Sequence, residues 1–206
     1  MVIAYDRLGF GKSDKRSDKL AMDFIADEAR TYFPFIREQL GFRKFVALGH
    51  SVGGGMAVYC ASHYAGDCEA LITESAQAFL EDRTLQSISI AKEQFKDEKQ
   101  AERLKKYHGE KTQWVLDAWT ETWLNSAFTS WSLAGVLPAV VSPVLVIHGM
   151  HDEYGSTRHP EMIGQLCSGP SRVEIIPDTY HVPHREQPKR ILDLVSEFLC
   201  GFPALR

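Results

Sequence analysis

A serine between glycines is the most direct candidate for chemistry in this sequence. The hexapeptide GHSVGG at 49–54 follows the apolar run 45–48 and precedes a segment with helical spacing. Glycines on both sides of Ser51 permit a sharp, strained turn, which would present the hydroxyl at the beginning of the helix. There the backbone N–H of Val52 points at the oxyanion that forms when a serine attacks a carbonyl carbon. The alternative is an ordinary turn in which Ser51 only caps the helix.

Two more polar residues follow apolar runs later in the chain. Asp152 comes after the run 144–147, and His181 lies in the loop after the run 172–176. An aspartate can orient a histidine, and a histidine can take the proton of a serine hydroxyl. Either residue alone is typical of an ordinary turn or a solvated loop. With Ser51 they occur in the order serine, aspartate, histidine, each behind its own run, and this favours a nucleophilic serine.

The residues leave alternatives open for the acid, for the base and for the type of site. Glu153 and Asp178 are further candidates for the acid, and His184 is a second candidate for the base. The second half of the chain is also rich in histidine, and its H-x-x-H spacings can occur in zinc sites. A metal-dependent site would draw on His148, His151, Asp152, His159, His181 and His184. Such a site would leave GHSVGG unexplained, so we expect no metal ion and no organic cofactor.

Strands and helices that alternate along the chain would position these residues. Short apolar runs are typical of buried parallel strands, and the loops that follow such strands gather at one edge of a sheet, where ligands bind. The sequence therefore predicts an α/β fold with a mostly parallel, doubly wound sheet between two layers of helices. The expected strands are 2–5, 45–48, 70–72, 143–147 and 172–176, and the expected helices are 22–40, 52–64, 160–167 and 189–199.

One long segment interrupts this alternation. Residues 75–137 are expected to form helices only, and they contain all four tryptophans. We therefore expect a core formed by 1–74 and 138–206, with 75–137 inserted in it as a helical cap. The dense charge run at 92–106 mixes both signs and is typical of a solvated helix face.

Three residues are candidates for lining a substrate pocket. Trp119 and Trp123 are one helical turn apart and share a face of the expected cap, and His50 adjoins Ser51. The cap would supply such a pocket because insertions above a sheet carry specificity. Packing of the cap onto the core is the commoner role for tryptophans in this position.

Composition excludes several classes of protein. The chain has 206 residues, a formal net charge of −4 and 44% hydrophobic residues, and no basic face suggests a nucleic-acid partner. The four cysteines show no C-x-x-C spacing, as in reduced cytoplasmic proteins. No apolar stretch is long enough to span a bilayer, and none resembles a signal peptide. We expect a soluble, cytoplasmic protein with no nucleic-acid or membrane partner.

Four segments resemble the α/β-hydrolase fold serine hydrolases. They are VIAYDRLGFGKSD, LGHSVGG, PVLVIHGMHDEYG and YHVPHREQP, and the YHGE…WTETWLNSAF part resembles the cap of bacterial esterases and carbon–carbon bond hydrolases. By this resemblance Ser51 is the nucleophile, Asp152 the triad acid and His181 the general base, while Val52 supplies one N–H of the oxyanion hole. The family's ending, in which the catalytic histidine precedes a hydrophobic-Pro-His turn, favours His181 over His184.

The resemblance also implies parts that this sequence does not show. The family's sheet normally begins with three more strands, and the loop after the third carries an HG-type motif that completes the oxyanion hole. We therefore expect an N-terminally truncated fold with 2–5 near an exposed edge of the sheet. Since the loss of one oxyanion donor costs about 10²–10³ in rate and an exposed sheet edge favours aggregation, the chain alone is expected to be a poor catalyst, or insoluble, although its triad is intact.

The expected activity is hydrolysis of a small acyl substrate. The resemblance implies cleavage of a carboxylic ester through a Ser-His-Asp triad and an acyl-enzyme. Thioester, lactone and carbon–carbon bond cleavage use the same triad and remain alternatives, as does a catalytically impaired binding protein with the same fold. The sequence does not choose an oligomeric state.

Overall fold

A four-stranded parallel sheet forms the centre of the molecule. The structure, a computed structural model, describes residues 1–201. The strands lie in the order β1-β2-β3-β4, and every neighbouring pair is parallel. Their bounds are Phe45–His50 for β1, Cys68–Glu74 for β2, Val144–Gly149 for β3 and Ser171–Ile176 for β4. These strands confirm four of the five that the apolar runs predict.

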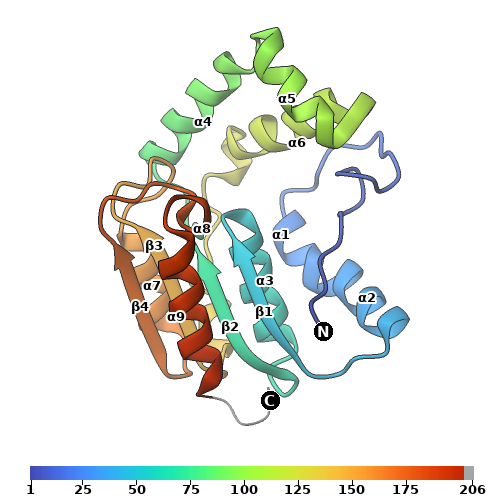
Figure 1. The fold of residues 1–206 in the computed structure, drawn as a ribbon. Coiled ribbons are helices and arrows are strands. Elements are labelled where there is room, and N and C mark those ends of the chain that lie inside the picture. The colour runs from blue at the N-terminus through green and yellow to red at the C-terminus, as the bar shows by residue number, and fades with distance from the viewer. Residues whose placement is uncertain (202–206) are drawn as a thin grey trace.

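Helices cover both faces of the sheet (Figure 1). The flanking helices are α3 (Val52–His63), α7 (Arg158–Leu166) and α9 (Pro188–Cys200). Side chains alternate along β3, so that Val144 and Val146 join the core cluster that α3 and α7 complete, whereas Leu145 and Ile147 pack with residues of α9. Because both faces of β3 are buried, the strand is apolar throughout, as is typical of doubly wound sheets.

Residues 1–23 contain no helix or strand. The expectation of a strand at 2–5 is wrong, since these residues pair with no strand in the described part of the chain and Val2 is 96% exposed. A strand persists only where a neighbour satisfies its backbone N–H and C=O groups, and none lies beside these residues. The edge of the sheet is instead β1, whose Leu48 side chain is 60% exposed.

The helix expected at 22–40 is present, with a widened turn in its middle. It consists of α1 (Phe24–Asp27), a π-helical turn (Glu28–Tyr32) and α2 (Phe33–Leu40). Pro34 has no N–H to donate and its ring needs room, and the wide turn lies directly before it. Gly41 ends the helix with a φ of +65°, as the sequence predicts.

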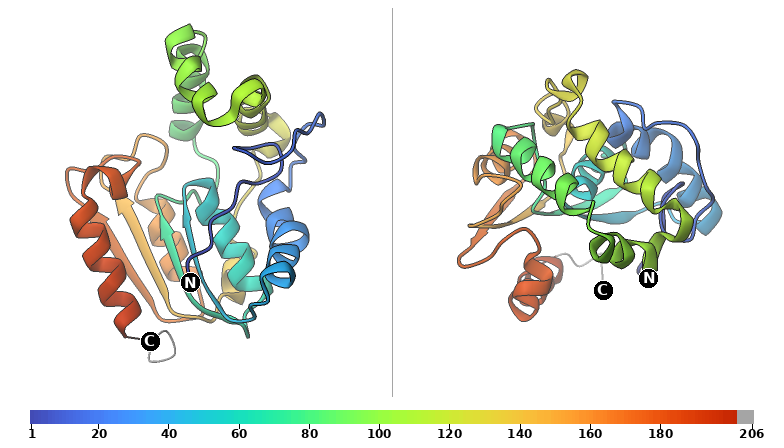
Figure 2. Two further views of the ribbon diagram at one scale, coloured as in Figure 1. Left: turned by 45° about the vertical axis from the view of Figure 1, so that its right-hand side comes forward. Right: turned by 90° about the horizontal axis from the view of Figure 1, so that it is seen from above.

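Only helices and short turns lie between β2 and β3, apart from one isolated bridge between Phe79 and Ser132. The helices are α4 (Asp82–Gln94), α5 (Glu98–His108) and α6 (Thr112–Trp123), with 3₁₀ turns at Gly109–Lys111, Ser126–Phe128 and Leu137–Ala139. Figure 2 shows the three helices above the carboxyl edge of the sheet. The charge run at 92–106 covers the end of α4 and most of α5, which buries no residue. The division into core and cap domains stays a prediction.

No helix within residues 1–201 combines the length and the apolar character that crossing a membrane requires.

Candidate active site

Ser51 occupies the turn between β1 and α3 in a backbone conformation that is rare for a residue with a side chain. Its φ is +54° and its ψ is −126°. The Ser51 N–H donates to the carbonyl of Glu74 at 2.8 Å, and the Ser51 carbonyl accepts from the N–H of Gly54 at 2.9 Å. Strained residues of this kind persist where surrounding bonds determine them, and they cluster at functional sites. The turn places the hydroxyl at the beginning of α3.

Two glycines near Ser51 are required by space and a third is not. A side chain at Gly49 would overlap the carbonyl of Gly53, and a Cβ at Gly54 would lie 2.5 Å from the Cβ of Ala76. A Cβ at Gly53 would meet nothing within 4 Å. The expectation that glycines are needed on both sides of Ser51 is confirmed at Gly49 and wrong at Gly53. The reason is that Gly54, and not Gly53, lies on the side of the first turn of α3 that packs against Ala76, in the segment after β2.

His181 connects Ser51 to Asp152. The His181 Nε2 lies 3.0 Å from the Ser51 Oγ, and the His181 Nδ1 lies 2.9 Å from each carboxylate oxygen of Asp152. A ring nitrogen that faces a carboxylate carries the hydrogen, so Nε2 is left to accept the hydrogen bond of the serine hydroxyl. The three residues follow β1, β3 and β4, and the parallel sheet brings their loops to one edge.

Asp152 is completely buried and fully hydrogen-bonded. Besides His181, it accepts from the backbone N–H of Tyr154 at 2.8 Å and of Gly155 at 3.2 Å, and His148 lies 3.5 Å away. Burial alone would raise the pKa of Asp152, but the hydrogen bond and charge of His181, then His148 and the Tyr154 N–H, outweigh it and hold the pKa below its usual value. Asp152 is therefore ionised at neutral pH and can orient His181.

The loop that carries His181 is clamped on both sides of the histidine. The Glu186 carboxylate accepts from the backbone N–H of Tyr180 at 2.7 Å and of Val182 at 2.9 Å. The end of β3 approaches so closely that a side chain at Gly149 would overlap the Tyr180 carbonyl. The position of the imidazole is thus determined by contacts with two other elements.

The alternative acids and the alternative base lie away from Ser51. Asp178 has a φ of +52° and a carboxylate that is 95% exposed, and Glu153 is exposed as well. The backbone N–H and the Nδ1 of His184 both bond to the Glu74 carboxylate, at 2.6 and 2.7 Å. The structure therefore brings together Ser51, His181 and Asp152 and none of these three alternatives.

A different group of residues lies close enough to share a metal ion. Within residues 1–201, ligand atoms of His50, Glu74 and His184 all lie within 4.8 Å of one another. The His50 Nε2 is 2.7 Å from the His181 carbonyl, and the Glu74 carboxylate already accepts two hydrogen bonds from His184. Burial lowers the pKa of His50 and keeps its ring neutral. The trio thus forms a hydrogen-bonded support beneath the histidine loop.

The six residues of the metal alternative do not gather in the described part of the chain. His148 donates to the Gly155 carbonyl at 3.0 Å, and His159 pairs with Glu81 at 3.1 Å. Each of these buried histidines has its own protein partner, so that alternative loses its geometric basis.

An apolar cavity of about 330 Å³ lies between the N-terminal segment, the beginning of α3 and the helices α5 and α6. Trp119 and Trp123 both line it, together with Val52, whose backbone N–H is the candidate oxyanion donor. As the first residue of α3, Val52 has no intrahelical acceptor for that N–H. Trp123 is also 4% exposed and packs on Phe128, so it is a pocket wall and a core residue at once.

His50 does not line this cavity, in contrast to our expectation. Its ring lies 5.0 Å from that of His181 and 5.2 Å from that of His184. Its Nε2 lies 2.7 Å from the His181 carbonyl, so His50 supports the loop that carries His181.

Two residues near the serine were missed by the sequence analysis. Gln77 is 4% exposed and its side-chain oxygen lies 3.4 Å from the Ser51 Oγ, so it offers the hydroxyl a second acceptor. The Tyr154 ring lies 4.7 Å from that of His181 and covers it. Both residues follow carboxyl ends of parallel strands, and this position was the available signal.

The chain is similar to several known proteins. A family model described as the alpha/beta hydrolase fold matches residues 1–99. A bifunctional esterase/perhydrolase of Acinetobacter calcoaceticus is 26% identical over 214 aligned positions, which cover 86% of this chain and 76% of that protein. A proline iminopeptidase of Saccharolobus solfataricus is 24% identical over 237 positions, covering 96% of this chain and 75% of that protein.

A solved structure of a thermophilic esterase from Thermogutta terrifontis superposes with a TM-score of 0.64 at 25% identity, covering 94% of this chain and 77% of the esterase. The parallel sheet, the turn at Ser51 and these matches identify the fold of the chain as the α/β-hydrolase fold. Esterase and peptidase relatives at low identity further support hydrolase activity.

Proposed function

We propose that this protein is a serine hydrolase that cleaves a small carboxylic ester or a related acyl substrate. The observation that carries the proposal is the hydrogen-bonded line from the Ser51 hydroxyl through His181 to the buried Asp152 carboxylate. Ser51 is the nucleophile, His181 the general base and Asp152 the group that orients the base. The relative that is an esterase favours an ester substrate over the other acyl compounds.

The reaction would proceed in two acyl transfers. His181 takes the proton of Ser51 as the Oγ attacks the carbonyl carbon, and the oxyanion that forms faces the N–H of Val52. The protonated His181 then gives its proton to the alcohol, which departs. The acyl group remains bound to Ser51 as an ester. A water molecule, deprotonated by the same imidazole, hydrolyses this ester and restores the serine. Each step uses groups of this chain and water.

The test is hydrolysis of 4-nitrophenyl esters together with labelling by a fluorophosphonate, which reacts only with an activated serine. We expect the original protein to hydrolyse these esters and to be labelled by the probe. Ser51→Ala should abolish labelling and lower kcat by at least about 10⁴-fold. Ser62→Ala is the matched control, because Ser62 lies on α3 and donates to the Tyr59 carbonyl of the same helix. A folded protein that neither hydrolyses the esters nor reacts with the probe would instead be a binding protein with this fold.

A further inference from the structure

The apolar cavity beside Val52 contains one permanently charged side chain. Its lining is otherwise aliphatic and aromatic, apart from Arg7 and His108. The His108 Nδ1 accepts from the Gly11 N–H at 2.9 Å, and burial lowers the pKa of His108, so this ring is neutral at neutral pH. A guanidinium stays charged at all relevant pH values. Arg7 is therefore the feature of the cavity that can select for charge.

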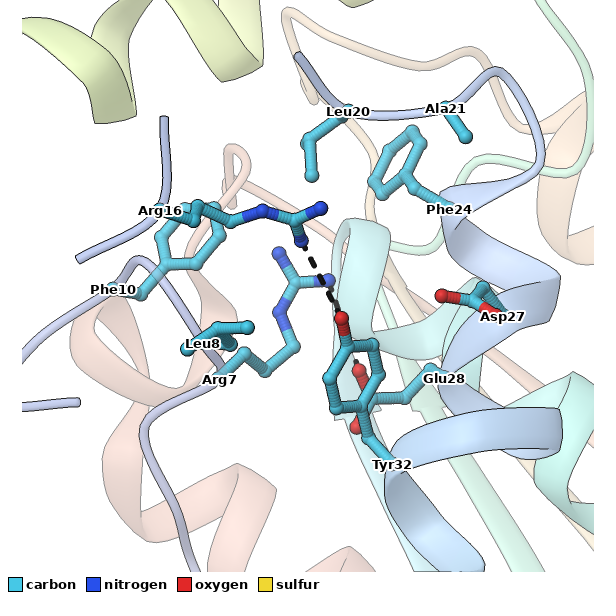
Figure 3. Close-up of a pocket in the computed structure, with 10 residues that line it drawn as sticks. All are labelled: Arg7, Leu8, Phe10, Arg16, Leu20, Ala21, Phe24, Asp27, Glu28 and Tyr32. Carbon is cyan, nitrogen blue, oxygen red and sulfur yellow. Dashed lines mark hydrogen bonds and ion pairs between the residues drawn. The ribbon is translucent and has the colours of Figure 1, made fainter. Parts of the chain in front are cut away.

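A small polar recess continues the cavity at Arg7. The recess has a volume of about 40 Å³ and shares Arg7, Phe10, Leu20 and Phe24 with the cavity as common walls. Arg16 also lines it, with its guanidinium 3.5 Å from the Tyr32 hydroxyl. Figure 3 shows the two guanidinium groups pointing into the same space, beside that hydroxyl. Arg16 already pairs with the Asp18 carboxylate through its Nε and Nη2, so Arg7 is the guanidinium of the recess that an anion can engage.

Arg7 has few strong hydrogen-bond acceptors among its protein partners. Its Nη1 donates to the Met56 sulfur at 3.1 Å, a weak acceptor, and lies 3.9 Å from the Glu28 carboxylate, beyond hydrogen-bond distance. Glu28 is the ion-pair partner of Arg7, and its carboxylate is also engaged by the hydroxyl of Tyr5. A partly buried guanidinium with so few strong acceptors gains from a ligand that supplies them.

Two acidic residues also line the recess, and carboxylates would attract a cation rather than an anion. Asp27 and Glu28 line the recess and not the cavity, whereas Arg7 lines both. Asp27 accepts from the Thr31 hydroxyl at 2.7 Å. A ligand that extends from Ser51 through the cavity therefore meets the guanidinium of Arg7 before either carboxylate, and this order favours an anion over an ammonium group.

The distance from the nucleophile to Arg7 fits a short acyl chain. The Arg7 guanidinium contacts Met56, which lies four residues after Val52 on α3. At 1.5 Å per residue this places the charged end about 6 Å along the helix from the candidate oxyanion donor. The walls between the two points are apolar and suit methylene groups.

We propose that the substrate's acyl group ends in a carboxylate, which Arg7 binds where the cavity meets the recess, while the chain fills the apolar cavity. The substrate class would be half-esters of short dicarboxylic acids, and Arg7 would be the specificity-determining residue. This inference rests on the proposed function, because it takes Ser51 as the point of attack.

Three 4-nitrophenyl esters of equal length test the substrate class. The hexanoyl ester ends in a methyl group, the adipoyl half-ester in a carboxylate and the 6-aminohexanoyl ester in an ammonium group. We expect kcat/KM to be highest for the carboxylate ester, and Arg7→Gln should lower its ratio to the methyl ester by about 10- to 100-fold, since hydrogen bonds to a charged group are worth that much. Arg103→Gln is the control, because Arg103 is exposed on α5.

A binding measurement separates this inference from the proposed function. Calorimetric titration of the Ser51→Ala protein with monomethyl adipate and with methyl hexanoate needs no catalysis and should show tighter binding of the adipate, which Arg7→Gln removes. Equal binding of the two compounds, or a preference for the ammonium ester in the rate assay, would overturn the carboxylate proposal. Two other results would contradict the proposed function itself. One is that Ser51→Ala hydrolyses all three esters as fast as the original protein does, and the other is that the original protein hydrolyses none of them.

Discussion

The direction of one hydrogen bond decides what Ser51 can do. Because the Nδ1–H of His181 donates to Asp152, the lone pair of the ring lies on Nε2, which is the atom facing the serine oxygen. An asparagine at 152 could offer its NH₂ group to Nδ1 instead. The ring would then carry its hydrogen on Nε2, and that tautomer cannot accept the serine proton.

Asp152→Asn should therefore lower kcat by about 10⁴-fold while leaving the fold intact. The asparagine keeps the size of the side chain and an oxygen for the N–H of Tyr154. Asp178→Asn is the matched control, since its carboxylate is exposed, and it should change kcat less than about 2-fold. Steady-state kinetics with a 4-nitrophenyl ester compares the three proteins. A comparable loss in both variants would show that Asp152 is not the acid of the triad.

Sequence spacing could find the loops of the site but not which side chain of a loop turns inward. Asp152, Glu153 and Asp178 all follow strand ends, so their positions along the chain do not distinguish them. The choice depends on backbone angles, such as the φ of +52° at Asp178, and on burial at 152. The order of residues along the chain could favour a nucleophile. The residues alone left the acid open, and the resemblance favoured Asp152, which the contacts of its buried carboxylate support.

At the scale of elements, the junction of β1 and α3 makes a prediction about helix packing. Gly54→Ala would push a Cβ to 2.5 Å from that of Ala76, whereas Gly53→Ala meets no atom within 4 Å. We expect Gly54→Ala to lower the free energy of unfolding by about 1–3 kcal/mol, the usual cost of overpacking. Gly53→Ala should leave it unchanged or raise it by up to about 1 kcal/mol, because alanine stabilises helices.

Urea unfolding of the two variants beside the original protein measures this difference. Activity is the second readout, because a shift of α3 moves the Val52 N–H and Ser51 together, and Gly54→Ala should lower kcat more than Gly53→Ala does. If both variants unfold at the same urea concentration, the contact between the first turn of α3 and Ala76 is not the constraint inferred here.

The elements differ in how far the sequence could predict them. Apolar runs such as the one in β3 have buried faces on both sides, so local pattern and final structure agree. The run at 2–5 is also apolar, yet it lies outside the sheet, because pairing depends on a neighbour and not on the run itself. The need for glycine at 54 rather than 53 also depends on a contact with the distant Ala76, which no local pattern contains.

At the scale of the whole molecule, buried neutral histidines make the stability of the fold depend on pH. Burial lowers the pKa values of His50, His148 and His159, and His159 is the extreme case, with a pKa of about 4. The His159 Nδ1 accepts from the Ala78 N–H at 3.1 Å, so a second ring proton would break a bond between α7 and the segment after β2. Folding therefore excludes a proton that the unfolded chain would take up.

The last prediction follows from the sign of that difference. Between a pKa of about 6.5 in the unfolded chain and about 4 in the fold, the unfolded state binds more protons, so stability falls as pH falls through this range. His159 alone should contribute a loss of about 2 kcal/mol between about pH 7.5 and about pH 5. His159→Gln removes the proton but keeps an acceptor for Ala78 and a donor for Glu81, so its stability should depend less steeply on pH. Urea midpoints at the two pH values measure the slopes, and His151→Gln, at a half-exposed side chain, should keep the slope of the original protein. An unchanged slope in His159→Gln would mean that this histidine titrates alike in the folded and unfolded chains.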